Sequence, residues 1–88
     1  MKELLQKIII KAYEITMNTK HDVFVDYAGH VNGVHIFIYE DGWKPNKEMS
    51  FSKDIYLNIK NTRKELEKVL DILEEYYREG VGENGTIT

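Results

Sequence analysis

Apolar residues recur through the first segment of the chain with the 3.6-residue period of an amphipathic helix. Between residues 3 and 17 they fall on one arc, which comprises Leu4, Leu5, Ile8, Ile9, Ala12 and Ile15. Asn18 follows as a typical helix-end residue. A second stripe lies outside this arc and is interpreted as either a self-association surface or ordinary exposed apolar residues, namely Ile10, Tyr13 and Met17.

The pattern changes to strict alternation after residue 21, which indicates strands with one buried side. Residues 22–31 and 34–40 alternate on either side of Asn32-Gly33, a pair that favours a type I′ hairpin turn. A loop at residues 43–47 holds the only proline and the only tryptophan, and a third alternating segment lies within residues 49–59.

A second helix is predicted to begin at Asn61-Thr62 and to end at Gly80. Its apolar stripe comprises Leu66, Val69, Leu70, Leu73 and Tyr77. The predicted fold is therefore α+β with the order α-β-β-β-α, in which two helices cover one face of a three-stranded antiparallel sheet. Residues 1–80 form a single domain in this prediction, and residues 81–88 form a C-terminal tail.

A two-residue turn at Asn32-Gly33 fixes a pairing for the hairpin. Val31 then faces Val34 and His30 faces His35, while Ala28 faces Phe37 and Asp26 faces Tyr39. The even-numbered face carries these histidines and several aromatic rings, and Tyr56 and Asn58 extend it from the third strand. We predict that this face and the nearby loop bind a ligand or partner through Phe24, His30, His35, Phe37, Tyr39, Trp43, Lys44 and Tyr56. The alternative interpretation is that the face is a dimer interface or an ordinary half-exposed sheet surface.

The two facing histidines raise the alternatives of a metal site and of acid–base catalysis. Opposed strand residues have Cβ atoms ~5 Å apart, which suits two zinc ligands. The third candidate ligand, Asp26, lies four residues from His30. This separation is ~13 Å along a strand, which is too far for both residues to bind the same metal ion. No lysine, nucleophile or phosphate-binding motif is fixed near the pair. We therefore expect no metal, no cofactor and no enzymatic activity.

Composition narrows the classes of partner. The chain has 88 residues, no cysteine and a net charge of −3. An acidic protein lacks the counterion-release term that drives binding to nucleic-acid duplexes. No apolar run approaches the ~18 residues of a membrane span, and no signal-peptide core is present at the N-terminus. A domain of this size has a thin stability margin, which favours a homo-oligomer.

The stretch HDVFVDYAGHVNGVHIFIYEDGW, with the pattern DVF…Y..HV and a strand ending in GW, resembles small proteins encoded by phages and prophages of Gram-positive bacteria. The residues that carry the resemblance are Asp22, Val23, Phe24, Tyr27, His30, Val31, Gly42 and Trp43. It covers about the first two-thirds of the chain and implies no specific activity.

The resemblance does imply a context, which is counter-defence or host takeover by stoichiometric binding in the cytoplasm of a bacterial host. In one version the protein sequesters a nucleotide immune signal within an oligomer. In the alternative it docks on a host defence protein, such as an RNA-guided nuclease, and blocks it. A small histidine-dependent nuclease is a further alternative.

Overall fold

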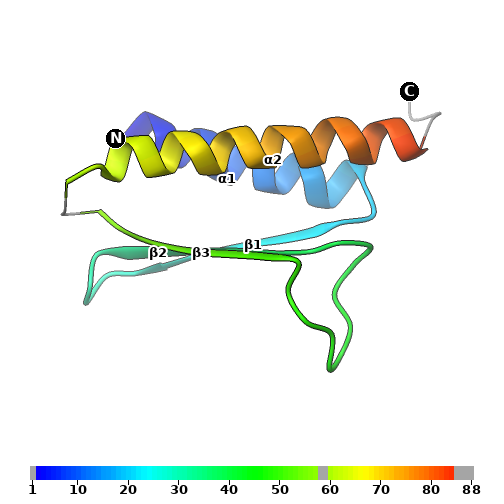
Figure 1. The fold of residues 1–88 in the computed structure, drawn as a ribbon, viewed down its shortest axis with the longest axis horizontal. Coiled ribbons are helices and arrows are strands. Elements are labelled where there is room, and N and C mark those ends of the chain that lie inside the picture. Colours follow the sequence, from blue (N-terminus) through cyan, green and yellow to red (C-terminus); the bar gives the residue numbers. More distant parts are fainter. Residues whose placement is uncertain (1, 58–59, 85–88) are drawn as a thin grey trace.

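The computed structural model describes residues 2–57 and 60–84, and it confirms the predicted α+β fold. The elements are α1 (Lys2–Asn18), β1 (Asp22–Ala28), β2 (Gly33–Tyr39), β3 (Phe51–Tyr56) and α2 (Thr62–Asn84). The strands form one antiparallel sheet in the order β1-β2-β3. Figure 1 shows α1 and α2 side by side in a single layer, so that both helices cover the same face of the sheet.

The core lies between the helix layer and the central strand. The alternation of β2 turns Val34, Ile36 and Ile38 toward the helices, where they are 0–3% exposed. The 3.6-residue stripes of the helices cover them, with Leu4, Ile8, Ala12 and Ile15 from α1 and Leu66, Val69 and Leu73 from α2. Each fully buried aliphatic side chain stabilises the fold by about 1.5–3 kcal/mol.

The edge strand β3 carries a charge on this same face. Lys53 is the register partner of Ile36, and its Nζ lies 3.0 Å from Glu65 Oε1 on α2. An inward-pointing charge at a sheet edge discourages pairing with another chain. The pair therefore ties β3 to the first turns of α2 and protects that edge.

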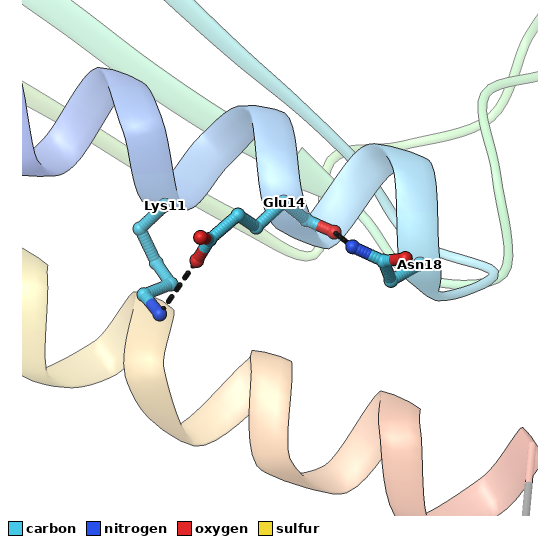
Figure 2. Close-up of polar contacts among 3 residues, drawn as sticks. All are labelled: Lys11, Glu14 and Asn18. Carbon is cyan, nitrogen blue, oxygen red and sulfur yellow. Dashed lines mark hydrogen bonds and ion pairs between the residues drawn. The ribbon is translucent and has the colours of Figure 1, made fainter. Parts of the chain in front are cut away.

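The end of α1 is closed by side chains of its last turns, drawn in Figure 2. Asn18 Nδ2 donates to the carbonyl oxygen of Glu14 at 3.0 Å, and Lys11 Nζ lies 2.8 Å from Glu14 Oε1. The backbone N–H of Thr19 donates to the carbonyl of Ile15 at 2.9 Å. The bond from the Thr19 amide satisfies one of the last four carbonyl groups, which a helix end otherwise leaves without partners.

The predicted register of the hairpin is wrong. Ala28 pairs with Gly33 and Asp26 pairs with His35, so that the turn spans residues 29–32 and His30 does not face His35. Asn32 has a φ of 50°, whereas Gly33 is not in the left-handed region that a type I′ turn requires.

The third strand accounts for the glycine at position 33, which lies within β2 rather than in the turn. Gly33 is the register partner of Tyr56, and a Cβ on Gly33 would lie 3.2 Å from the tyrosine ring. Gly33 is therefore small because a ring of β3 packs over it, not because it forms the turn. The turn is held instead by a bond of 2.8 Å from the Tyr27 hydroxyl to Asn32 Oδ1.

Gly80 does not end the second helix as predicted, because α2 continues to Asn84. Residues 81–84 of the predicted tail are therefore helical, and residues 85–88 lie outside the described part of the chain. Gly80 is buried, and a Cβ there would lie 2.6 Å from both Cβ and Cγ2 of Thr19. The glycine thus permits α2 to approach the connection between α1 and β1.

Replacing Gly80 with alanine should lower the free energy of unfolding by about 1–2 kcal/mol, since the clash outweighs the gain in helix propensity. Thr19 has little freedom to move, because its hydroxyl donates to the Ile15 carbonyl at 2.7 Å and accepts from the His21 amide at 3.0 Å. Urea unfolding followed by circular dichroism measures the change.

Gly82→Ala is the matched control. Gly82 lies on the same helix, and a Cβ added to it would meet no atom within 4 Å, so alanine there should leave stability unchanged or raise it slightly. Equal effects of the two substitutions would contradict the close approach at Gly80.

Candidate binding face

The face of the sheet turned away from the helices, called the open face below, is built from every second residue of the strands. Its cross-strand rows are Ala28–Gly33–Tyr56, Asp26–His35–Asp54, Phe24–Phe37–Ser52 and Asp22–Tyr39. Figure 1 shows both helices on the opposite side. Within residues 22–28, 33–39 and 51–56, no lysine or arginine lies on this face.

Three aromatic rings form the centre of the open face. Phe24 and Phe37 are register partners and stack with their centroids 4.8 Å apart and an interplanar angle of 2°. Tyr39 meets both edge-on, at 5.7 Å from Phe24 and 6.1 Å from Phe37. Tyr39 is only 8% exposed, whereas Phe24 is 37% exposed. The result is a preorganised apolar platform, since each aromatic pair adds about 0.5–1.5 kcal/mol beyond burial.

A row of ionisable groups adjoins this platform. His35 lies between its register partners Asp26 and Asp54, and its ring packs against Phe37 with centroids 4.8 Å apart. His35 Nδ1 contacts Asp54 Oδ1. An ionised carboxylate only accepts hydrogen bonds, so the Nδ1 proton of His35 is the donor. The side chains of His35 and Asp54 remain 38% and 58% exposed and are accessible to a partner.

A shallow pocket of about 190 Å³ opens beside this row, at the hairpin end of the sheet. Its small residues are Ala28 and Gly33, and the ring of Tyr56 lines one side. Asp26 and Asp54 also line it. Pockets for drug-sized ligands have volumes of about 300–1,000 Å³. This pocket therefore suits a single side chain.

The loop between β2 and β3 borders the other end of the open face. The backbone N–H of Trp43 donates to Asp22 Oδ2 at 2.7 Å, and Lys47 Nζ bonds the carbonyls of Gly42, at 3.1 Å, and of Glu40. Figure 1 shows this loop projecting on the side opposite the helices. Trp43 is 52% exposed, and Lys44 is exposed beside it.

The base of this loop is anchored to the helix layer by a buried histidine. His21 is 5% exposed, its Nδ1 accepts from the Asp41 amide at 3.1 Å, and its ring meets Tyr76 of α2 edge-on at 5.5 Å. The Tyr76 hydroxyl donates to Glu40 Oε2 at 2.7 Å. Burial, followed by this bond to Glu40, raises the pKa of Tyr76 to about 12. The cluster is structural and positions the segment that carries Trp43.

The structure places the predicted residues in three groups. His30 is exposed in the hairpin turn, away from His35, and Trp43 and Lys44 lie on the bordering loop. Asn58 lies outside the described residues. The open face brings together Phe24, His35, Phe37, Tyr39 and Tyr56.

The acidic character of the site is not among the predictions from sequence. The alternation predicts Asp26 on the correct face but opposite Tyr39, and the predicted site does not include Asp54. The same alternation that places Tyr56 on this face also places Asp54 there, two residues earlier. Within residues 2–57 and 60–84, no group of three or more histidine, cysteine, aspartate or glutamate side chains is placed to hold a metal ion. Neither described helix is long and apolar enough to cross a bilayer.

Tyr76→Phe should reduce stability by about 1 kcal/mol at neutral pH, the usual net value of one hydrogen bond. The deficit should shrink at alkaline pH. The hydroxyl of tyrosine loses its proton near pH 10 in the unfolded chain, whereas the pKa of Tyr76 in the folded protein is about 12. The contribution of the Tyr76 hydroxyl to stability is therefore complete below pH 10 and is lost as the pH rises toward 12. Urea unfolding of both proteins across this range measures it, and a difference that is independent of pH would contradict the assignment.

Comparisons of the chain with models of protein families, with curated proteins and with solved structures find no match. The resemblance to phage and prophage proteins therefore stays a prediction. The function has to be argued from the chemistry of the open face.

Proposed function

We propose that the protein is a non-enzymatic binding protein whose open face docks on a basic surface of another protein. The observation that carries the proposal is the placement of Asp26 and Asp54 on either side of His35, next to the pocket lined by Tyr56. An arginine or lysine side chain of the partner would enter this pocket, and the aromatic platform would cover apolar surface around it.

Charge supports a basic partner. The strand residues of the open face include three aspartates and no lysine or arginine, and the whole chain carries a net charge of −3. A guanidinium can bridge two carboxylates and lie on a tyrosine ring, where cation–π attraction adds about 0.5–2 kcal/mol. Arginine and aromatic residues are also the side chains that dominate binding energy at protein interfaces.

The same features argue against a nucleotide signal as the ligand. Phosphate groups placed near Asp26 and Asp54 would be repelled, and the pocket of about 190 Å³ is smaller than typical small-molecule sites. Of the two predicted versions of counter-defence, occlusion of a host defence protein is the one that the site favours. An RNA-guided nuclease holds nucleic acid in a positively charged channel, which complements the open face.

The separation of the histidines supports binding rather than turnover. A histidine acid–base pair needs both rings within reach of one substrate, and His35 faces Asp26 rather than His30. The proposed mode of action is stoichiometric occlusion in the bacterial cytoplasm.

The first test is a titration of isotope-labelled protein with a short arginine-rich peptide, followed by amide chemical shifts. Shifts should concentrate at Asp26, His35, Asp54 and Tyr56. Asp26→Asn and Asp54→Asn should each weaken binding about fivefold to tenfold, as expected for loss of a charge-assisted contact of about 1–1.4 kcal/mol. Asp71→Asn, on the exposed side of α2, is the matched control and should bind normally. A cyclic dinucleotide that shifts these amides while the peptide does not would contradict the proposal.

A second test measures counter-defence in cells. The wild-type protein should restore phage plaques in bacteria protected by an RNA-guided nuclease, and the Asp26→Asn/Asp54→Asn double variant should not. Rescue should need about equimolar protein and nuclease. Rescue at catalytic amounts, or rescue only in bacteria protected by nucleotide signalling, would contradict occlusion.

A further inference from the structure

Helix α1 exposes an apolar stripe on the side that neither α2 nor the sheet covers. Ile9, Ile10, Tyr13 and Met17 are 54%, 56%, 65% and 62% exposed. The helical periodicity predicts Ile9 in the core arc, and this prediction is wrong. The stripe is contiguous, because residues three and four apart on a helix are neighbours.

The spacing of the stripe is that of a helix-pairing seam. Gln6, Ile10, Tyr13 and Met17 are separated by four, three and four residues, which is the a/d spacing of a heptad. Ile9 lies beside this seam. Apolar grooves between α1 and β1 continue it, lined by Leu5, Val23, Val25 and Tyr27 among others.

The position of α1 disfavours the other common mode of association, which is pairing of the β1 edge with a foreign strand. The Thr16 hydroxyl accepts a hydrogen bond from the Val23 amide at 3.2 Å. Side chains of α1 therefore reach the outer edge of β1 and occupy a backbone donor there. A helix that covers an edge protects it from strand addition.

We propose that the stripe is a self-association surface, on which α1 of a second copy packs in the antiparallel direction. Gln6 of one copy then lies opposite Met17 of the other, and Ile10 lies opposite Tyr13. Such a two-fold arrangement uses the same patch on both copies. Because the seam matches its own antiparallel copy in this way, a second copy of this chain is the partner that it fits.

The area of the stripe agrees with a dimer of modest affinity. With side chains of roughly 150–200 Å² each, its exposed fractions correspond to on the order of 400 Å² of apolar surface per protomer. Two such patches and their polar rims approach the ~1,200 Å² lower limit of specific interfaces. We therefore expect a dissociation constant in the micromolar range.

Charge selects the antiparallel direction. Lys7 and Glu14 lie one heptad apart on the same flank of the seam. Glu14 also pairs within its own helix with Lys11, as Figure 2 shows, and the Nζ of Lys11 lies 4.5 Å from the Tyr77 ring centroid on α2. Antiparallel packing brings Lys7 of each copy toward Glu14 of the other. In a parallel pair these two equivalent positions would lie on opposite sides of the seam, and this attraction would be lost.

Sedimentation equilibrium tests the association itself. The wild-type protein should dimerise with a micromolar dissociation constant, and Tyr13→Glu should weaken dimerisation at least tenfold. Met49→Glu is the control, because Met49 is a 45% exposed apolar residue outside α1. A wild-type protein that stays monomeric at high concentration, or equal weakening by both variants, would overturn the proposal. Circular dichroism verifies that each variant folds.

Engineered cysteines test the direction. The chain has no cysteine, so Gln6→Cys and Met17→Cys each introduce a single thiol. A disulfide requires Cα atoms within ~7 Å. Oxidation of a mixture of the two variants should give a linked dimer, whereas Met17→Cys alone should stay unlinked. Linkage of Met17→Cys to itself would indicate parallel packing, and absence of linkage in the mixture would place the interface elsewhere; either result overturns the proposal.

Discussion

The structure depends on the burial of one aliphatic face of β2 beneath two helices. The apolar stripes of α1 and α2 together cover Val34, Ile36 and Ile38. Two helices can cover a narrow sheet only if they pack closely together. That requirement explains the glycine at position 80, where α2 approaches Thr19. Because both helices are used on one face, the opposite face is left to solvent or to partners.

The sequence predicted which residues share a face but not which residues face each other. The observed partner of each β2 residue lies four residues before the predicted one, so that His35 meets Asp26 instead of His30. A slip by an even number of residues leaves the alternation unchanged, and the predicted core face and open face are therefore correct. Gly33 lies within β2, where its neighbour is Tyr56 of a strand beyond the hairpin, and not in the two-residue turn that its sequence predicts. A short-range turn signal contains no information about that contact.

The parts of the site that escaped prediction are those made by distant segments. Asp54 reaches His35 from the next strand, and Tyr76 reaches Glu40 and His21 from the last helix. Alternation assigns a residue to a face, and helix periodicity assigns it to a stripe. Neither gives the order of neighbours across elements. Aromatic residues on an exposed face can be recognised from sequence as candidate binding residues, because they are usually buried. Aspartates are common on solvated surfaces, so an aspartate can be assigned to a site only when its neighbours are known.

The two proposed surfaces have different physical consequences for binding. Helix α1 lies on the opposite side of the sheet from the open face, so a dimer formed through the α1 stripe would keep both open faces accessible. A single open face offers one small pocket and a platform of three rings, which limits its affinity for a flat basic surface. In a dimer, once one open face has bound, binding of the other becomes an intramolecular step. The overall affinity then exceeds that of a single open face, although the residues that contact the target are the same. Self-association at modest affinity would thus compensate for the small area that a domain of this size can present to a much larger target.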